Sequence, residues 1–415
     1  SILMLLRWWL ILTLIFLCPK QGWPKPVLLH KLNFGNAGAW VVRFGDLNGD
    51  GEVDLLSVQN RHRQPTCLTA WTLRGKKLWQ QGIPDLRNAT VTADLPVQLF
   101  DWNRDGKDEV LLVRQGMLQV LQGTTGALLQ ETPTLDYDSI FIFQPRPSEP
   151  VFWLLLKDRY QRFWVYDDTL QLRWEGAANT GHFPLALDVE GDGQNELLVG
   201  YSLFSNAGAL RWKLSLPRHA DALAYGDLNG DGRPEIGIAT SGDAVLLTLE
   251  GKVAWRKPLR HSQHVGVLTN TVNTPWGKQV LFVDRGRYGQ VIAYNAAGKR
   301  LWSLPPQGFF AALTVVSGWS GHKNEQFAVI FRRDLGGGAI MIDGSGAIVG
   351  EFPFAPAAHG GRVNQYFVQH FDALGDGREE ILIYNERELW VYGNGAPQPK
   401  VITIQVSLPN PRIYN

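Results

Sequence analysis

The chain has few cysteines and almost no excess of charge. Only two cysteines occur among 415 residues, and no Cys or His spacing typical of a zinc site is present. The formal net charge is +1, which argues against a nucleic-acid-binding protein, because such proteins normally carry a basic excess. No long amphipathic helix is visible, and beyond the N-terminal region there is no low-complexity segment or charge run. With 44 glycines, 16 tryptophans and 45% hydrophobic residues, the chain can bury a large core.

The N-terminal apolar stretch is too short to span a bilayer comfortably. A short basic region ends at Arg7, and the stretch from Trp8 to Cys18 has the length of a signal-peptide core. We interpret residues 1–22 as a signal peptide or N-terminal anchor, with lipidation of Cys18 as an alternative. The prediction is a secreted or cell-surface protein that meets the membrane only through this segment. Cys67 then has no partner in the mature chain and is expected to be a buried, small apolar residue.

Acidic residues concentrate in a short motif within residues 44–58, FGDLNGDGEVDLLSV. Oxygen-bearing side chains occupy positions 1, 3, 5 and 9 of this glycine-bent loop: Asp46, Asn48, Asp50 and Asp54. Calcium prefers such a ligand set, whereas magnesium favours a smaller octahedral shell with several waters. An EF-hand would require Glu at position 12, where this loop has Ser57, and a helix on each side. For a single copy, a metal-free Asp/Asn/Gly turn is the alternative.

The motif recurs four times, each time between apolar segments, so a metal-free origin is improbable. Side-chain ligands are predicted at Asp101, Asn103, Asp105 and Glu109; at Asp188, Glu190, Asp192 and Glu196; at Asp227, Asn229, Asp231 and Glu235; and at Asp372, Asp376 and Glu380. Position 7 would contribute its main-chain carbonyl, from Glu52, Lys107, Gln194, Arg233 and Arg378. The fifth copy has Leu374 at position 3, so we expect its site to be the weakest.

The spacing of the five loops predicts the architecture. Their first aspartates fit a repeat of about 45 residues, with three further repeats that lost the loop near residues 140, 275 and 320. Each unit contains four short strands, so we predict an all-β fold. It would be a single β-propeller over residues 23–415 with eight four-stranded blades, or seven as the alternative. For ring closure, two segments compete: residues 27–34 and the tail 400–415.

A tryptophan recurs near the end of the units. Five copies fall at one structural position: Trp79, Trp174, Trp212, Trp255 and Trp302. Packing between neighbouring blades is the favoured interpretation, and a sugar-stacking row is the alternative.

The loops DLNGDGEVD and DLNGDGRPE resemble those of FG-GAP or VCBS repeats, found in integrin alpha-subunit propellers and in many secreted bacterial propellers. The resemblance covers about residues 40 to 395 and implies a Ca²⁺-binding propeller. Eight-bladed rhamnogalacturonan lyases carry similar loops, which implies a polysaccharide lyase as the enzymatic alternative, although no catalytic motif can be transferred. The GKxLW strands resemble quinoprotein propellers, which makes a quinone-dependent dehydrogenase a third and more distant interpretation.

In such propellers, the links between blades and the turns between second and third strands form the face opposite the calcium loops. The links carry His182, His219, Asp221, His261, His264, His359 and Arg362. The turns carry Arg61, His62, Arg63, Arg114, Lys157, Arg159, Arg285, Arg287, Arg332 and Arg333. Such a face is expected to attract anions. The alternative is that these side chains are solvated or paired with carboxylates.

Two classes of function follow. The favoured one is an exported, monomeric, calcium-stabilised propeller that binds an anionic glycan or an extracellular protein, with no chemistry of its own. The other is a lyase of a uronate-containing polymer, in which Lys, Arg or His abstracts the proton α to the carboxyl group.

Overall fold

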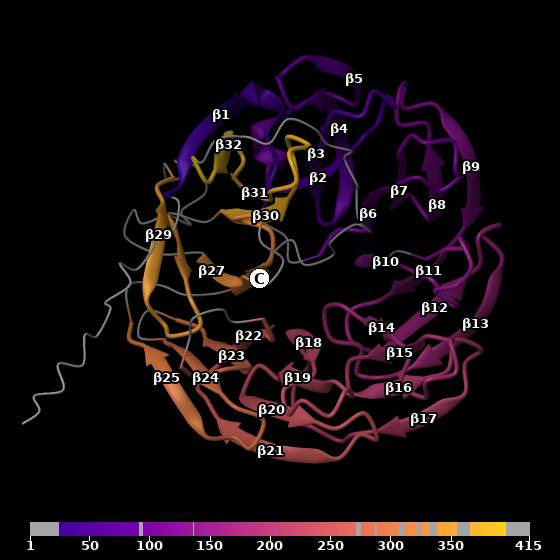
Figure 1. The fold of residues 1–415 in the computed structure, drawn as a ribbon. Helices are drawn as coiled ribbons and strands as arrows, with labels where there is room; N and C mark the ends of the chain where they lie inside the picture. Colours follow the sequence, from indigo (N-terminus) through magenta and orange to yellow (C-terminus); the bar gives the residue numbers. More distant parts are fainter. Residues whose placement is uncertain are drawn as a thin grey trace, which may run out of the picture.

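The computed structural model describes residues 25–90, 94–135, 137–270, 275–286, 289–306, 312–321, 325–331, 338–354 and 366–395. Eight four-stranded antiparallel sheets are arranged in a ring, and the chain runs once around it (Figure 1). The predicted all-β, eight-bladed propeller is confirmed. We number the blades in chain order, with blade 1 formed by β2 to β5 and blade 8 by β30, β31, β32 and β1.

In blades 1 to 7 the strands follow chain order from the centre of the ring outward, and in blade 8 the N-terminal β1 takes the outer place after β30, β31 and β32. The inner strands are β2 (Val41–Gly45), β6 (Val97–Phe100), β10 (Ser139–Phe143), β14 (Leu185–Leu187), β18 (Ala222–Gly226), β22 (Ser262–Leu268), β26 (Ala312–Val316) and β30 (Phe367–Phe371). The second strands are β3 (Asp54–Arg61), β7 (Glu109–Arg114), β11 (Trp153–Lys157), β15 (Glu196–Val199), β19 (Glu235–Ala239), β23 (Gln279–Asp284), β27 (Phe327–Phe331) and β31 (Glu380–Tyr384). The third strands are β4 (Gln64–Thr72), β8 (Met117–Leu121), β12 (Arg162–Tyr166), β16 (Ser202–Phe204), β20 (Asp243–Leu247), β24 (Val291–Tyr294), β28 (Ala339–Ile342) and β32 (Glu388–Gly393). The outer strands are β5 (Lys77–Gln81), β9 (Leu128–Pro133), β13 (Leu172–Ala177), β17 (Leu210–Lys213), β21 (Val253–Pro258), β25 (Arg300–Leu304), β29 (Ile348–Phe352) and β1 (Val27–Asn33).

Two short 3-10 helices, η1 (Gly35–Ala37) and η2 (Leu86–Asn88), lie at the start of blade 1 and in the link that leaves it. Among the described residues, no helix has the length and apolar character needed to cross a membrane.

The ring is closed by the N-terminal strand. β1 pairs antiparallel with β32, from Val27 opposite Gly393 to Asn33 opposite Glu388. This pairing covers an edge that would otherwise expose unpaired backbone groups. The sequence left two candidates for this role, and the structure uses residues 27–34. The competing tail lies outside the described residues.

The three blades without acidic loops occur where the repeat predicted them. Their first two strands are β10 and β11, β22 and β23, and β26 and β27. The repeat therefore continues around the ring even where the loop sequence has diverged.

The core is divided among the eight blade interfaces. Each of the eight buried clusters joins residues of one blade to residues of the next, and the cluster between blades 8 and 1 closes the circle. Strands such as β3 are buried on both faces, because each sheet packs between two others. Cys67 on β4 is 1% exposed, as predicted.

The repeated tryptophans connect neighbouring blades, as predicted. Each indole N–H donates to a backbone carbonyl of the following blade: Trp79 to Gly123, Trp174 to Asn206, Trp212 to Leu249, Trp255 to Ala296 and Trp302 to Gly344, at 2.7, 2.8, 2.9, 3.0 and 3.0 Å. The ring face lies against a turn glycine of that blade; for Trp212 this is Gly251.

This contact predicts a large effect for Gly251→Ala. The residue has φ +80°, and an added Cβ would lie 2.6 Å from the Trp212 ring. Gly277→Ala is the matched control, because Gly277 has φ +66° with nothing within 4 Å of an added Cβ. Both variants incur about 1–2 kcal/mol of left-handed backbone strain, and Gly251→Ala a further ~1–3 kcal/mol from overpacking. Urea unfolding measures both; equal losses would contradict the tryptophan contact.

Candidate functional site

The five acidic loops share one backbone arrangement between the first and second strands of blades 1, 2, 4, 5 and 8. In blade 1, the carboxylate of Asp46 accepts hydrogen bonds from the N–H groups of Gly49 and Gly51 at 2.8 and 2.9 Å. The bond from position 6 to position 1 recurs in the other four loops, from Gly106 to Asp101, Gly193 to Asp188, Gly232 to Asp227 and Gly377 to Asp372. Each first aspartate therefore organises its own loop.

The carboxylate at position 9 is buried beneath each loop. In blade 1, Oδ2 of Asp54 accepts hydrogen bonds from the N–H groups of Leu47 and Asn48 at 2.9 and 3.3 Å. Its Oδ1 is buried with no hydrogen-bond partner among the described residues. Burial raises the pKa of Asp54 to about 7, and likewise those of Glu109 to about 7 and Glu380 to about 8. A cation at this position would stabilise the ionised form and satisfy the remaining oxygen.

Four loops bring three carboxylate oxygens within 4.8 Å of one another. These sets are Asp46, Asp50 and Asp54; Asp101, Asp105 and Glu109; Glu190, Asp192 and Glu196; and Asp372, Asp376 and Glu380. Hard oxygen donors at such spacing fit calcium, which takes six to eight oxygen ligands in a flexible shell. Asp188 contributes to its loop through backbone hydrogen bonds rather than through the blade 4 set.

Basic side chains contact predicted ligand oxygens of three loops. In blade 4, Nε of Arg211 lies 3.1 Å from Oε1 of Glu190. In blade 8, the guanidinium of Arg378 lies 3.0 Å from Asp376 and donates to Asn394 at 2.7 Å. Leu374 is 48% exposed and offers no oxygen. In blade 5, Nζ of Lys278 lies 3.6 Å from Asp227. These cations compete with a metal ion, which leaves the loops of blades 1 and 2 as the best-formed sites.

The other predicted loop residues lie at the surface. Asn48, Asn103 and Asn229 each donate from the side chain to the position 5 aspartate, at 3.2 to 3.3 Å. Of the position 7 residues, Glu52 pairs with Arg74 and Arg233 with Glu250. Gln194 accepts from Asn206, and Lys107 packs beside Gly49 of blade 1.

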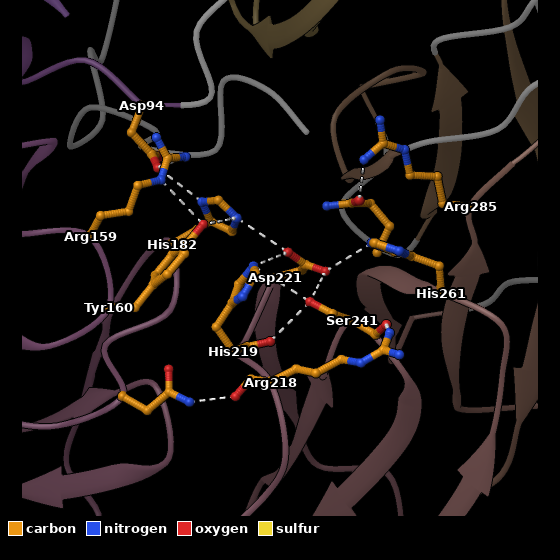
Figure 2. A network of polar contacts seen from close by, with 12 residues as sticks. Asp94, Arg159, Tyr160, His182, Arg218, His219, Asp221, Ser241, His261 and Arg285 are labelled. Carbon is orange, nitrogen blue, oxygen red and sulfur yellow. Dashed lines mark hydrogen bonds and ion pairs between the residues drawn. The ribbon is translucent and has the colours of Figure 1, made fainter.

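On the opposite face, three histidines converge on Asp221, in the link between blades 4 and 5 (Figure 2). Oδ1 of Asp221 lies 3.2 Å from Nε2 of His182 and 3.0 Å from Nε2 of His219. Oδ2 lies 3.3 Å from Nε2 of His261 and accepts a hydrogen bond from the Ser241 hydroxyl at 2.6 Å. Burial alone would raise the pKa of Asp221, but the three histidines around its carboxylate lower it far below its usual range.

His182 is buried between two carboxylates. Its Nδ1 lies 2.9 Å from Oδ2 of Asp94, on the side away from Asp221. Burial would lower the pKa of His182, but the charge of Asp94 and the hydrogen bonds to both carboxylates raise it to about 9. The hydroxyl of Tyr160 lies 3.2 Å from Nε2 of His182, and its ring stacks on His219 at 4.1 Å and 10°.

A second buried pair lies in blade 3. Nζ of Lys157 donates to Oδ1 of Asp138 at 2.8 Å, and both side chains are fully buried. Oδ2 of Asp138 has no hydrogen-bond partner among the described residues. Lys157 is therefore not available at the surface. A count of the basic residues on this face overestimates its exposed positive charge.

Sequence reasoning missed Asp94 and Asp138 because it considered mainly basic residues on this face. A signal was present: Asp138 directly precedes the inner strand of blade 3, just as Asp221 directly precedes that of blade 5. Aligning the links blade by blade would have exposed this recurring aspartate.

An open pocket of about 590 Å³ lies beside the histidine cluster, between blades 3 and 4. Its lining includes Arg159, Lys213 and Arg218, together with Tyr160 and His219. The other described residues of the lining are Gln161, Ala177, Ala178 and Asn179, and none of the described lining residues carries a carboxylate. We call this the blade 3–4 pocket.

Another pocket of about 590 Å³ lies at the turn of blade 1. It is lined by Arg61, His62, Arg63 and Arg87, but also by Asp85, which pairs with Arg87 at 2.6 Å. This blade 1 pocket therefore combines basic and acidic groups.

The structure brings Arg159, His182 and His219 together. His264 is buried at 3% exposure on β22, and Arg285 donates to Gln263 at 3.0 Å on the far side of the cluster. The remaining candidates lie outside the described residues: Arg287, Arg332, His359 and Arg362.

Comparison with solved structures finds propellers of similar shape but different sequence. The biofilm matrix protein Bap1 of V. cholerae has a TM-score of 0.61 and 13% identity, over 91% of this chain and 88% of that chain. The rhamnogalacturonan lyase YesW has a TM-score of 0.56 and 18% identity, over 92% and 76%. BamB from Moraxella catarrhalis has a TM-score of 0.57 and 14% identity, over 90% and 99%.

At these identities, the similarity shows the fold alone. No protein-family model matches the sequence, and no curated protein matches it.

Proposed function

We propose that the protein is an exported, calcium-stabilised propeller of the FG-GAP type that binds an anionic glycan in the blade 3–4 pocket. The observation that carries this proposal is the pocket lining, which combines Arg159, Lys213 and Arg218 and has no carboxylate among its described residues. Elsewhere on this face, the blade 1 pocket includes Asp85, and the histidine cluster surrounds Asp221.

The pocket also offers the stacking surface that sugar rings use. Tyr160 and His219 form parallel rings at its edge. Arg218 is oriented by a hydrogen bond from Nη1 to the Ser241 carbonyl at 2.6 Å. Arg159 lies 3.4 Å from Asp94 and keeps 33% of its side chain exposed, so part of its guanidinium can reach a ligand. Guanidinium groups bind carboxylates and sulfates through paired hydrogen bonds.

The predicted signal peptide and the predicted calcium loops are consistent with each other. Residues 8–18 have the length of a signal-peptide core. Extracellular calcium modules work at dissociation constants of about 10⁻⁴ to 10⁻³ M, which suits exposed loops that bind through a few carboxylates. Proteins of similar fold include a biofilm matrix protein and rhamnogalacturonan lyases, which is compatible with a carbohydrate ligand.

Binding of polygalacturonate, measured by isothermal titration calorimetry, tests the proposal. We expect Lys213→Ala combined with Arg218→Ala to weaken binding at least tenfold, because both remove charge from the pocket without touching a buried ion pair. Binding should also weaken with salt, since the screening length falls from ~10 Å at 0.1 M to ~3 Å at 1 M.

Arg61→Ala combined with Arg63→Ala is the matched control, because it removes two exposed cations from the blade 1 pocket. If the control loses binding and the Lys213 and Arg218 variant keeps it, the glycan binds in the blade 1 pocket instead. Equal binding by both variants and the parent would refute an arginine- and lysine-based site.

A lyase is the second candidate, favoured by the position of His219 next to Arg159 in the same pocket. His219 would abstract the proton α to the uronate carboxyl group, while Arg159 neutralises the developing charge. The bond from C4 to the glycosidic oxygen would then break as the C4–C5 double bond forms, and the departing sugar oxygen would take up a proton from water or from protonated His219. Burial raises the pKa of Tyr160, which disfavours its phenolate as the base. Incubation with polygalacturonate or rhamnogalacturonan should then produce the absorbance of unsaturated uronates, and binding without that signal would leave a non-catalytic function.

A further inference from the structure

We propose that His182, His219, His261 and Asp221 form a binding site for a first-row transition-metal dication, with zinc as the probe ion. The site is separate from the calcium loops and lies on the opposite face, at the centre of the residues in Figure 2. Its chemistry differs as well, because imidazole nitrogen suits zinc and its neighbours, whereas calcium prefers oxygen.

The donors come from three successive links of the ring. His182 lies between blades 3 and 4, His219 and Asp221 between blades 4 and 5, and His261 between blades 5 and 6. The sequence therefore has no compact zinc motif, and the spacing of the ligands is set by the blade repeat. The ring brings all three histidines to one carboxylate.

Three of the four donors lie close enough to share one metal ion, and the fourth approaches the same carboxylate. With metal–ligand bonds of about 2.0–2.2 Å, neighbouring ligand atoms of a tetrahedral zinc site lie about 3.3 Å apart. The three histidine nitrogens lie 3.2, 3.0 and 3.3 Å from the nearest oxygen of Asp221. One donor atom each of His182, His219 and Asp221 lies within 4.8 Å of the others. His261 is outside this set and contacts the second carboxylate oxygen, so it would complete the site by a small movement toward the ion.

Neighbouring side chains hold these donors in place, as residues around the ligands of metal sites usually do. A carboxylate only accepts hydrogen bonds, so Asp94 places the proton of His182 on Nδ1 and directs Nε2 toward Asp221. Metal-binding histidines usually donate their other nitrogen to such a carboxylate. Stacking on Tyr160 fixes the ring of His219, and the Ser241 hydroxyl holds Oδ2 of Asp221.

The competing arrangement is a metal-free network in which a second proton on His182 bridges Asp94 and Asp221. A metal ion would replace that proton, because ligating imidazoles must offer a lone pair, so binding would release protons. Direct metal titration separates the two arrangements.

The test uses the full chain, treated with a chelator, dialysed into millimolar calcium to fill the acidic loops, and titrated with zinc chloride. We expect a single tight zinc ion per chain, and cobalt chloride should give the visible absorption of tetrahedral cobalt. A parent protein that binds neither ion under these conditions would overturn the proposal without any variant.

Three variants locate the ion. His261→Ala, at a partly exposed ligand, should weaken zinc binding at least tenfold, and Asp94→Asn should weaken it about 10–100-fold by loosening His182. His62→Ala removes an exposed histidine of the blade 1 turn and should change nothing. If both cluster variants keep their secondary structure by circular dichroism and the parent affinity for zinc, the ion binds elsewhere and the assignment is wrong.

Discussion

Chelation of calcium is expected to lower the thermal stability of this protein substantially. At a calcium concentration a hundredfold above its dissociation constant, each filled loop adds roughly 2.7 kcal/mol to the free energy of unfolding. The loop of blade 1 also joins two blades, because Asp108 of blade 2 accepts a hydrogen bond from the Asp46 N–H at 2.7 Å. Loss of its ion would therefore weaken an interface of the ring. Differential scanning calorimetry with calcium and with EDTA measures the effect.

Two loop variants sharpen this prediction. Asp105→Ala in blade 2 should remove about one site's share of the calcium-dependent gain in melting temperature. Asp376→Ala in blade 8 should leave that gain nearly unchanged, because Arg378 already neutralises Asp376 and Leu374 provides no ligand. For each variant, the quantity to compare is the difference between its melting temperatures with and without calcium. The hydrogen bonds that an aspartate makes without metal affect both temperatures, so their loss does not change this difference. An identical melting temperature of the parent with and without EDTA would contradict structural calcium.

Lys157→Met is expected to destabilise the protein by about 3–5 kcal/mol, because it leaves a buried carboxylate without its cation. Asp138 is fully buried, and its second oxygen already has no hydrogen-bond partner among the described residues. The nearby Asp94 adds a like charge, and burial together with it raises the pKa of Asp138 despite the attraction of Lys157. Urea unfolding followed by circular dichroism measures the loss.

Two controls distinguish the buried pair from ordinary surface charge. Replacing both partners, as Lys157→Met with Asp138→Leu, should recover much of the loss, since no unpaired charge remains. Arg146→Ala removes one partner of the exposed pair with Glu149 and should cost less than about 1 kcal/mol. A loss for Lys157→Met as small as that for Arg146→Ala would show that Asp138 is neutral or reaches water.

The candidate site was only partly predictable. The histidines of the links and the arginines of the turns are visible in the sequence, and the repeat assigns them to one face. Their partners are not visible, because Asp94 and His182 are far apart in the chain and meet only across two blades. For the same reason the sequence suggested a free cation at Lys157, whereas the fold buries it against Asp138.

The sequence by itself predicted the all-β repeat and the acidic loops, and it favoured eight blades over seven and packing between blades as the role of the tryptophans. These features depend on contacts within one blade or between adjacent blades, so the same residue pattern appears in the sequence of each repeat. Tertiary structure alone decided which end closes the ring, because the pairing of β1 with β32 joins opposite ends of the described chain. It also decided which charges on the link face are free and which are paired. Those pairs form where successive blades converge on the axis, and burial there allows a charge to persist only beside its partner.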